Sequence, residues 1–317
     1  MNRLSLVRST AIVALFSCAV ISARAADLHP VTIERDVAVK MRDGVTLHAD
    51  VYRPKAEGRF PTLLQRTPYD KRNGTDFGLR AAAEGYVAIV QDVRGRYSSE
   101  GEWYPFKNES SDGYDTVEWA AALPYSNGKV GMWGGSYVGA TQMLAAVAHP
   151  PHLAGICPVV TASNYHDGWA YQGGAFEQWF DESWTSGLAQ DTMNRLVQGN
   201  TNAMEGVLTL PLSDYSLFNL PNLAASTSIA SLAPYFADWL AHPDYDDYWK
   251  QLSIEEHYSD INVPALHIAA WYDIFPGGIA AKLRRQQGSR RERCAQETAL
   301  AGDNRRSRGQ RPEDWRR

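Results

Sequence analysis

The chain of 317 residues contains only three cysteines, Cys18, Cys157 and Cys294. So few thiols exclude a disulfide framework, and neither Cys157 nor Cys294 lies near a second Cys or His at metal-binding spacing, which argues against structural zinc. No apolar run reaches the ~20 residues that a membrane-spanning helix needs. Because 44% of the residues are hydrophobic and 21% are charged, the composition is that of a globular protein with a large core.

The N-terminal end has the pattern of a secretory signal peptide. Arg3 and Arg8 precede an apolar run, and Ala23-Arg24-Ala25 supplies the small side chains of a cleavage site after Ala25. A membrane anchor is the alternative, but the run is too short to span a bilayer. We therefore predict that residues 1–25 are removed, that the mature protein is secreted or periplasmic, and that it has no membrane partner.

Short apolar runs alternate with helical segments from residue 31 onward. Val37–Met41 and Val45–Tyr52 flank an Asp43-Gly44 turn, which predicts a β-hairpin. Further elements are predicted as buried strands over 60–65, 86–91 and 130–133 and as helices over 79–84 and 112–122. A hairpin followed by this alternation predicts an α/β fold with a mostly parallel sheet covered by helices.

Residues 164–256 differ in composition from the rest of the chain. They are rich in Trp, Tyr, Asn and Asp, and they lack a strand-like run. Residues 229–240 and 245–252 have the spacing of short amphipathic helices. We interpret 164–256 as a helical cap over one end of the sheet, whose aromatic side chains either line an apolar pocket or only pack the cap. Residues 264–271 then return to a buried strand, which ends at Tyr272-Asp273.

The clearest chemical signal surrounds Ser136. A strand, a sharp turn with Gly134 and Gly135, and a helix-like stretch over 140–148 are the setting of a nucleophile elbow. Glycines remove Cβ atoms that would clash in a strained turn, and the following helix offers its N-terminal amides to a developing oxyanion. Val138 replaces the last glycine of the common Gly-x-Ser-x-Gly pattern, so an ordinary turn between strand and helix is the alternative.

The segment Gly134-x-Ser136-Tyr137-x-Gly139 resembles the elbow of the cocaine-esterase-like (CocE/NonD) acyl hydrolases, which are related to X-Pro dipeptidyl-peptidases and α-amino-acid ester hydrolases. The resemblance runs from about residue 33 to 279. Its other segments occur in the family's order, namely Met41–Val45, Tyr52–Pro54, Arg66–Lys71, Gln91–Arg96, Ser99–Gly101 and Trp271–Asp273. The resemblance implies an α/β-hydrolase fold with a helical cap, and we expect no cofactor and no metal.

The resemblance also implies roles for four residues. Ser136 would be the acyl-accepting nucleophile, and Asp273 would be the carboxylate that orients a histidine and stabilises its protonated form. The Tyr69 hydroxyl and the Tyr137 backbone amide would donate to the oxyanion of the tetrahedral intermediate. Without the resemblance, Tyr69 is as well explained as a loop tyrosine packed under the cap, and Asp273 as a turn or helix-cap residue before Pro276.

The histidine that this chemistry requires is missing after Asp273. In α/β-hydrolases the chain order is Ser, acid, His, whereas all eight histidines here precede Asp273, namely His29, His48, His149, His152, His166, His242, His257 and His267. We therefore expect a domain that lacks its last strand or strands, the histidine loop and the C-terminal β-sandwich of the family. The strand before Asp273 would then be an exposed edge, and activity would be impaired. Rescue by His166, His242 or His257 of the cap is an alternative without support from spacing.

Residues 282–317 carry twelve basic residues against five acidic ones, within a chain whose formal charge is −5. This segment has too few apolar residues for their burial to offset the conformational entropy lost on ordering. We therefore expect it to be a disordered tail. An arm that binds nucleic acid or acidic lipid is one interpretation, but we favour an out-of-frame or truncated end and expect no nucleic-acid partner. The predicted organisation is a signal peptide over 1–25, a hydrolase domain over 26–281 and the basic tail over 282–317.

The sequence as a whole predicts a secreted serine hydrolase. It would cleave an ester or amide bond, acyl or X-Pro dipeptidyl, through an acyl-enzyme on Ser136. The expected partner is a small-molecule ester or amide, and the oligomeric state stays open. The alternative is a non-catalytic binding protein whose basic tail meets an anionic partner.

Overall fold

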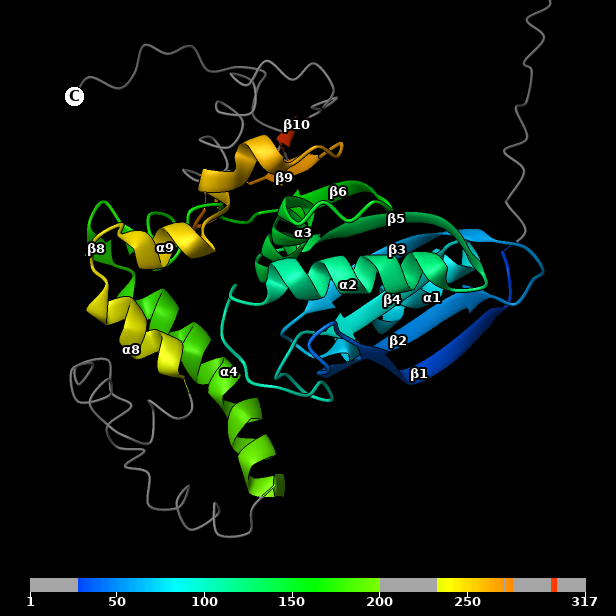
Figure 1. Cartoon of the computed structure of the whole chain (residues 1–317), viewed down its shortest axis with the longest axis horizontal. Coiled ribbons are helices and arrows are strands. Elements are labelled where there is room, and N and C mark those ends of the chain that lie inside the picture. Colours follow the sequence, from blue (N-terminus) through cyan, green and yellow to red (C-terminus); the bar gives the residue numbers. More distant parts are fainter. Residues whose placement is uncertain (1–27, 200–232, 271, 276–297, 301–317) are drawn as a thin grey trace, which may run out of the picture.

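The computed structural model describes residues 28–199, 233–270, 272–275 and 298–300 (Figure 1). The predicted signal peptide, most of the basic tail and residues 200–232 of the cap lie outside the described residues. The strands are β1 Val31–Lys40, β2 Thr46–Pro54, β3 Phe60–Thr67, β4 Val87–Asp92, β5 Ser126–Gly135, β6 Leu153–Val159, β7 Tyr171–Gln172, β8 Ala175–Phe176, β9 His267–Ala269 and β10 Thr298–Leu300. The helices are η1 Lys71–Gly74, α1 Thr75–Ala83, α2 Glu109–Ala122, α3 Tyr137–Val147, α4 Gln178–Gly199, α8 Pro234–Ala241, α9 Asp247–Leu252 and η3 Ile254–Asp260.

The main sheet has eight strands in the order β1-β2-β4-β3-β5-β6-β9-β10. β1 and β2 form the predicted antiparallel hairpin, and β2 also pairs antiparallel with β4. From β4 onward every neighbouring pair is parallel. The predicted α/β-hydrolase class is therefore confirmed, and the carboxyl ends of the parallel strands gather at one edge of the sheet.

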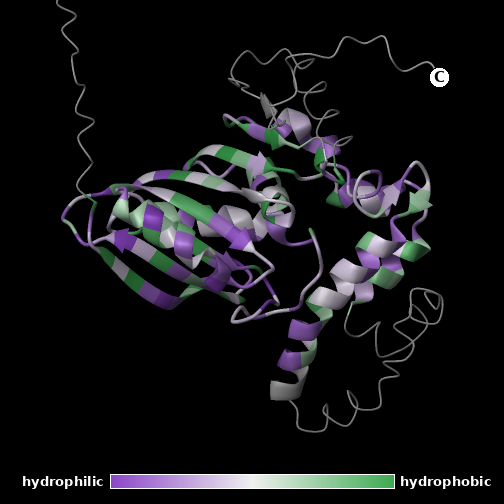
Figure 2. Ribbon diagram, turned by 180° about the vertical axis from the view of Figure 1, so that it is seen from behind, coloured by the Kyte–Doolittle hydropathy of each residue, from purple (hydrophilic) through white to green (hydrophobic). Residues whose placement is uncertain are grey.

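Helices cover both faces of the sheet (Figures 1 and 2). Alternate residues of β4 point to opposite faces, so that Val87 and Ile89 join the core under α2 and α3, while Ala88 and Val90 pack with α1. All six residues of β4 are buried, as expected of a central strand in a sheet covered on both faces. Figure 2 shows polar and apolar residues alternating in the outer strands, which face solvent.

Four strands differ from the predictions. β10 pairs in parallel with β9, so the expectation that the last strand is missing and that β9 is the sheet edge is wrong for this edge. The short Thr-Ala-Leu stretch of β10 suits a strand and satisfies the outer amides and carbonyls of β9, although it lies within a segment predicted as disordered. β6 was not predicted because Gly155 and Pro158 interrupt its apolar run. The cap also contains the two-residue strands β7 and β8.

The cap elements between β6 and β9 lie beside one end of the sheet rather than over its faces (Figure 1). The end of the cap returns to the end of β6 through Ser163, whose carbonyl oxygen accepts the Ile254 N–H at 2.9 Å and the Ser253 hydroxyl at 3.0 Å. In the described part of the chain, no helix is long and apolar enough to cross a membrane.

Candidate active site

Ser136 occupies a strained turn between β5 and α3. Its φ of 57° and ψ of −130° lie outside the regions that residues with a Cβ usually adopt. Its N–H donates to the Val159 carbonyl oxygen at 2.9 Å, and its own carbonyl oxygen accepts the Gly139 N–H at 2.8 Å. The backbone on both sides of the hydroxyl is therefore fixed, as the predicted nucleophile elbow requires.

The packing of the glycines around Ser136 explains why Val138 stands where the Gly-x-Ser-x-Gly pattern has its last glycine. A Cβ on Gly134, whose φ is 137°, would lie 2.3 Å from Cγ1 of Val138. Val138 thus fills the space that Gly134 leaves open. A Cβ on Gly139 would lie 2.7 Å from Cγ2 of Thr161, so the second glycine is required one position later, where α3 approaches the chain that follows β6.

Tyr69 lies beside Ser136, as the sequence predicted. Its hydroxyl accepts the indole N–H of Trp184 at 3.0 Å, and it lies close enough to the Ser136 side chain for that group to lower its pKa. Burial raises the pKa of the Tyr69 hydroxyl, although the hydrogen bonds with Trp184 and Ser136 partly offset this rise. The phenol is therefore a neutral donor at physiological pH, which suits a group that meets developing negative charge.

The turn that carries Tyr69 is held at both ends. The Tyr69 N–H donates to the Thr67 hydroxyl at 3.0 Å. The buried guanidinium of Arg96 donates to the Pro68 carbonyl oxygen at 3.1 Å and to the Leu188 carbonyl oxygen of α4 at 2.8 Å. Arg96 thus ties the turn of the core to the cap.

Tyr137 begins α3, so its amide has no carbonyl four residues earlier within the helix and is free to donate forward. Its side chain has a separate, structural role. The buried phenol donates to Glu109 Oε1 at 3.0 Å and accepts the Phe106 N–H at 2.8 Å. Glu109 in turn pairs with Arg66 at 2.7 Å. Burial, more than any other cause, raises the pKa of Glu109.

Asp273 follows β9 at the same edge of the sheet as Ser136. Gly135 pairs with Val159 of β6, and Val159 pairs with Ile268 of β9, so the carboxyl ends of β5 and β9 lie at the same edge of the sheet with β6 between them. Asp273 Oδ1 accepts the Phe275 N–H at 3.4 Å, the turn contact that was the structural alternative for this residue. Oδ2 is buried and has no hydrogen-bond partner within the described residues. Asp273 therefore keeps an acceptor that suits an imidazole N–H.

Aromatic side chains of the cap connect Asp273 to Tyr69. Phe275 stacks on Trp169 with ring centroids 4.9 Å apart, and Trp169 contacts Trp184 at 5.6 Å. Phe180 closes the group against Phe275 at 5.7 Å. The space between these rings is only about 10 Å³ and is lined by Gly168, Trp169, Tyr171, Gln172, Glu177, Phe180, Ile274 and Phe275. The cap aromatics here therefore pack against one another and leave no room for a substrate group.

The three cap histidines make their contacts with other groups of the cap and of the segment that follows it. His166 Nε2 lies 2.8 Å from the Pro243 carbonyl oxygen, His242 Nδ1 lies 2.5 Å from Asp246, and His257 Nδ1 lies 3.3 Å from Asp260. His166 is also sandwiched by rings of the cap. These contacts give no support to the alternative in which one of them serves as the base for Ser136.

Within the described residues, no group of three or more His, Cys, Asp and Glu side chains is arranged to hold a metal ion. A larger cavity is lined by Arg94, Trp103, Lys107 and Arg195 among others, and it does not include Ser136, Tyr69 or Asp273. The sequence analysis missed Trp184 as a partner of Tyr69. Its only signal was the aromatic richness of the cap.

Comparison with known proteins places the chain in a family. Residues 43–293 match the X-Pro dipeptidyl-peptidase (S15) family, and the chain belongs to it. Cocaine esterase from Rhodococcus sp. (strain MB1 Bresler) is 34% identical over 260 residues, which are 78% of this chain and 45% of that protein. The resemblance to the cocaine-esterase-like hydrolases is therefore confirmed.

Solved structures share the fold. A CocE/NonD family hydrolase from Staphylococcus aureus has a TM-score of 0.64 at 24% identity and covers 85% of this chain and 46% of its own. An α-amino acid ester hydrolase has a TM-score of 0.58 at 21% identity, with 87% and 49% covered. At these identities the likeness concerns the fold alone. The chain spans about half the length of these relatives, so the activity of the longer proteins comes to this chain only as a proposal.

Proposed function

We propose that the chain is a secreted or periplasmic serine hydrolase that forms an acyl-enzyme on Ser136 from small-molecule esters or amides. The observation that carries this proposal is the strained elbow that presents Ser136 beside the Tyr69 hydroxyl. Family membership supports it. Secretion is supported by the pattern of residues 1–25, which lie outside the described residues.

The chemistry follows from the positions of the donors. Ser136 Oγ attacks the carbonyl carbon, and the carbonyl oxygen becomes an oxyanion that the Tyr69 hydroxyl and the Tyr137 amide stabilise. The bond to the alcohol or amine then breaks, the proton of the Ser136 hydroxyl passes to the leaving group or to solvent, and the acyl group stays on Ser136.

In a triad of this kind a histidine accepts the serine proton and later protonates the leaving group, and Asp273 Oδ2, which has no partner within the described residues, is the acceptor that would orient it. An amine leaving group must be protonated to depart, whereas an activated alkoxide or phenolate departs unaided. We therefore propose that activated esters react faster than X-Pro amides with this chain.

A serine-directed fluorophosphonate tests the proposal. The full chain should be labelled, and labelling should disappear in the Ser136→Ala variant while the Ser183→Ala variant, altered at an exposed serine of α4, labels like the parent. Hydrolysis of p-nitrophenyl acetate should exceed that of an X-Pro p-nitroanilide. Labelling that persists in Ser136→Ala would refute the role of Ser136.

A further inference from the structure

The turn that presents Tyr69 contains a strained residue. Asp70 has a φ of 79°, in the left-handed region that non-glycine residues seldom occupy. Such a conformation persists only where the surroundings hold it. Asp70 Oδ1 accepts the Arg72 N–H at 2.9 Å, and Asn73 Nδ2 donates to the Tyr69 carbonyl oxygen at 2.5 Å. Both contacts are exposed to solvent, so they are weak restraints on the phenol.

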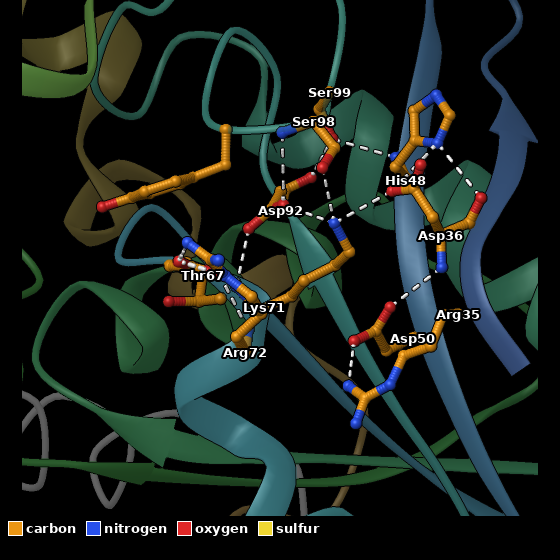
Figure 3. Close-up of polar contacts among 12 residues, drawn as sticks. Arg35, Asp36, His48, Asp50, Thr67, Lys71, Arg72, Asp92, Ser98 and Ser99 are labelled. Atoms are coloured by element: carbon orange, nitrogen blue, oxygen red, sulfur yellow. Dashed lines mark hydrogen bonds and ion pairs between the residues drawn. The ribbon is translucent and has the colours of Figure 1, made fainter. Parts of the chain in front are cut away.

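A stronger restraint comes from Asp92, the last residue of β4. Asp92 Oδ1 accepts the Lys71 backbone N–H at 2.7 Å, and Oδ2 accepts Lys71 Nζ at 3.0 Å (Figure 3). Because Thr67 of β3 lies opposite Asp92 in the parallel ladder, this carboxylate lies at the strand end from which the turn departs. The carboxylate of Asp92 thus holds both the backbone N–H and the side-chain ammonium of Lys71, the residue that follows Asp70.

The Lys71 ammonium has three donors, and the structure supplies three partners. Besides Asp92, these are the Ser98 hydroxyl at 2.7 Å and Asp36 Oδ1 at 3.1 Å (Figure 3). Burial lowers the pKa of Lys71, but the charges of Asp92 and Asp36 outweigh it and the pKa is raised overall. Lys71 therefore stays protonated and saturated, so it is neither a general base nor a nucleophile.

Stability alone gives little reason for this arrangement. The side chains of Lys71 and Asp92 are only 6% and 0% exposed, and moving two charges out of water is expensive. Apolar residues of similar volume often stabilise a protein as well as a buried ion pair does. The ion pair of Lys71 and Asp92 instead contributes conformational specificity, because its hydrogen bonds are compatible with only one geometry of the turn.

We propose that Lys71 is a positioning residue that holds the Tyr69 hydroxyl on Ser136. The ammonium joins β1, the end of β4 and the loop after β4 to the turn, and the clamp on residue 71 maintains the strained Asp70 and, through it, the phenol. This inference rests on the proposed role of Tyr69 as an oxyanion donor.

A double-mutant cycle between Lys71→Met and Tyr69→Phe tests the inference in the full chain. The quantity measured is the second-order rate constant for fluorophosphonate labelling of Ser136, together with kcat and KM for p-nitrophenyl acetate. Since loss of one oxyanion donor costs about 10²- to 10³-fold, displacing that donor through Lys71→Met should lower the labelling rate by about 10-fold or more. The loss should fall on kcat rather than KM. In the Tyr69→Phe background, Lys71→Met should cause no further loss.

Arg94→Met is the matched control. Arg94 is also a mostly buried cation between two carboxylates, Asp43 at 2.7 Å and Asp112 at 2.6 Å, but neither of these carboxylates holds the Tyr69 turn. Its removal should destabilise the fold and leave the labelling rate of the folded protein unchanged. If Lys71→Met does not fold, Asp36→Asn and Ser98→Ala decide the question, because Asp36 is 56% exposed. Each should lower labelling by about 2- to 10-fold, again only when Tyr69 is present.

The outcomes separate the inference from the proposed function. Equal losses in the Tyr69 and Tyr69→Phe backgrounds, or no loss in the folded variants, would overturn the positioning role of Lys71. If labelling depends on Ser136 and Tyr69 but not on Lys71, only the inference fails. If labelling is independent of Ser136, the proposed function fails, and the inference with it.

Discussion

Trp184 of α4 donates its indole N–H to the hydroxyl oxygen of Tyr69 at 3.0 Å. This hydrogen bond joins the cap to the turn of the core directly beside Ser136. Because the indole occupies an acceptor site of the phenol, the phenolic proton is left for Ser136 or for an oxyanion. The cap therefore helps to set the candidate oxyanion donor.

Replacing Trp184 by Phe removes this donor and keeps an aromatic ring. We expect fluorophosphonate labelling of Ser136 to slow by about 2- to 10-fold, the worth of one hydrogen bond, because the phenol becomes less polarised. Trp179→Phe on the same helix is the control, since Trp179 is 70% exposed and should tolerate the change. Equal rates for the parent and Trp184→Phe would show that the contact does not tune Tyr69.

Replacing Gly134 by Ala should disrupt the elbow. The new Cβ would meet Val138 Cγ1 at 2.3 Å on a backbone whose φ is 137°, so we expect a loss of about 3 kcal/mol in unfolding free energy and a fall in labelling. Gly173→Ala, at a φ of 58° with nothing within 4 Å, should cost only about 1 kcal/mol. Adding Val138→Ala to Gly134→Ala should restore part of the loss in urea unfolding. Similar costs at both glycines would contradict the packing argument.

Replacing Glu109 by Gln should destabilise the core because it leaves the guanidinium of Arg66, which is 0% exposed, without its closest charge partner. Breaking a buried pair from one side typically costs about 3 to 5 kcal/mol. The exposed pair of Glu118 and His152 provides the comparison, and Glu118→Gln should cost at most about 1 kcal/mol. Urea denaturation of both variants measures the difference, and costs of equal size would be inconsistent with the burial of Arg66 and Glu109.

Asp181 predicts a pH dependence of stability. Burial, and secondarily the charge of Glu177, raises the pKa of Asp181 from 3.8 to about 9, and neither carboxyl oxygen has a hydrogen-bond partner within the described residues. Between these two values the folded protein keeps a proton that the unfolded chain releases. Stability from this group is therefore complete at low pH and falls as the pH rises, by up to about 1.4 kcal/mol per unit, until about pH 9.

The variant Asp181→Asn has no carboxyl proton to lose, so its stability should fall less steeply than that of the parent as the pH rises. The Tm of the variant should exceed that of the parent by a margin that grows from pH 5 to pH 9. Asp244→Asn, at an exposed position of the cap, should shift Tm equally at both pH values. A margin for Asp181→Asn that is constant or shrinks with rising pH would contradict the burial of a protonated carboxyl.

The α/β fold and the elbow could be predicted because their signals are local. A strand, two glycines, a serine and a helix follow one another within about twenty residues around Ser136, and the physics of a tight turn explains each of them. β6 was missed because glycine and proline weaken its strand pattern. β10 could not be predicted because its three residues become a strand only by pairing with the open side of β9, which is a tertiary effect.

The surroundings of Tyr69 could not be predicted for a related reason. Trp184 is separated from Tyr69 by 115 residues, and no periodicity of the cap reveals which of its aromatic residues meets the core. Lys71 lies within a segment that already carried the family resemblance, yet its function depends on Asp36, Asp92 and Ser98 from three other parts of the chain. A single sequence indicates which residues are chemically capable, whereas their convergence is a property of the fold.

The most direct measurement is the site of acylation itself. The full chain is mixed with p-nitrophenyl acetate, quenched in acid and digested, and the acetylated peptide is identified by mass spectrometry. The account predicts a burst of p-nitrophenolate and one acetyl group on Ser136, because an activated ester acylates the serine faster than water hydrolyses the acyl-enzyme. Acetylation at another residue, or a burst of equal size in Ser136→Ala, would contradict it.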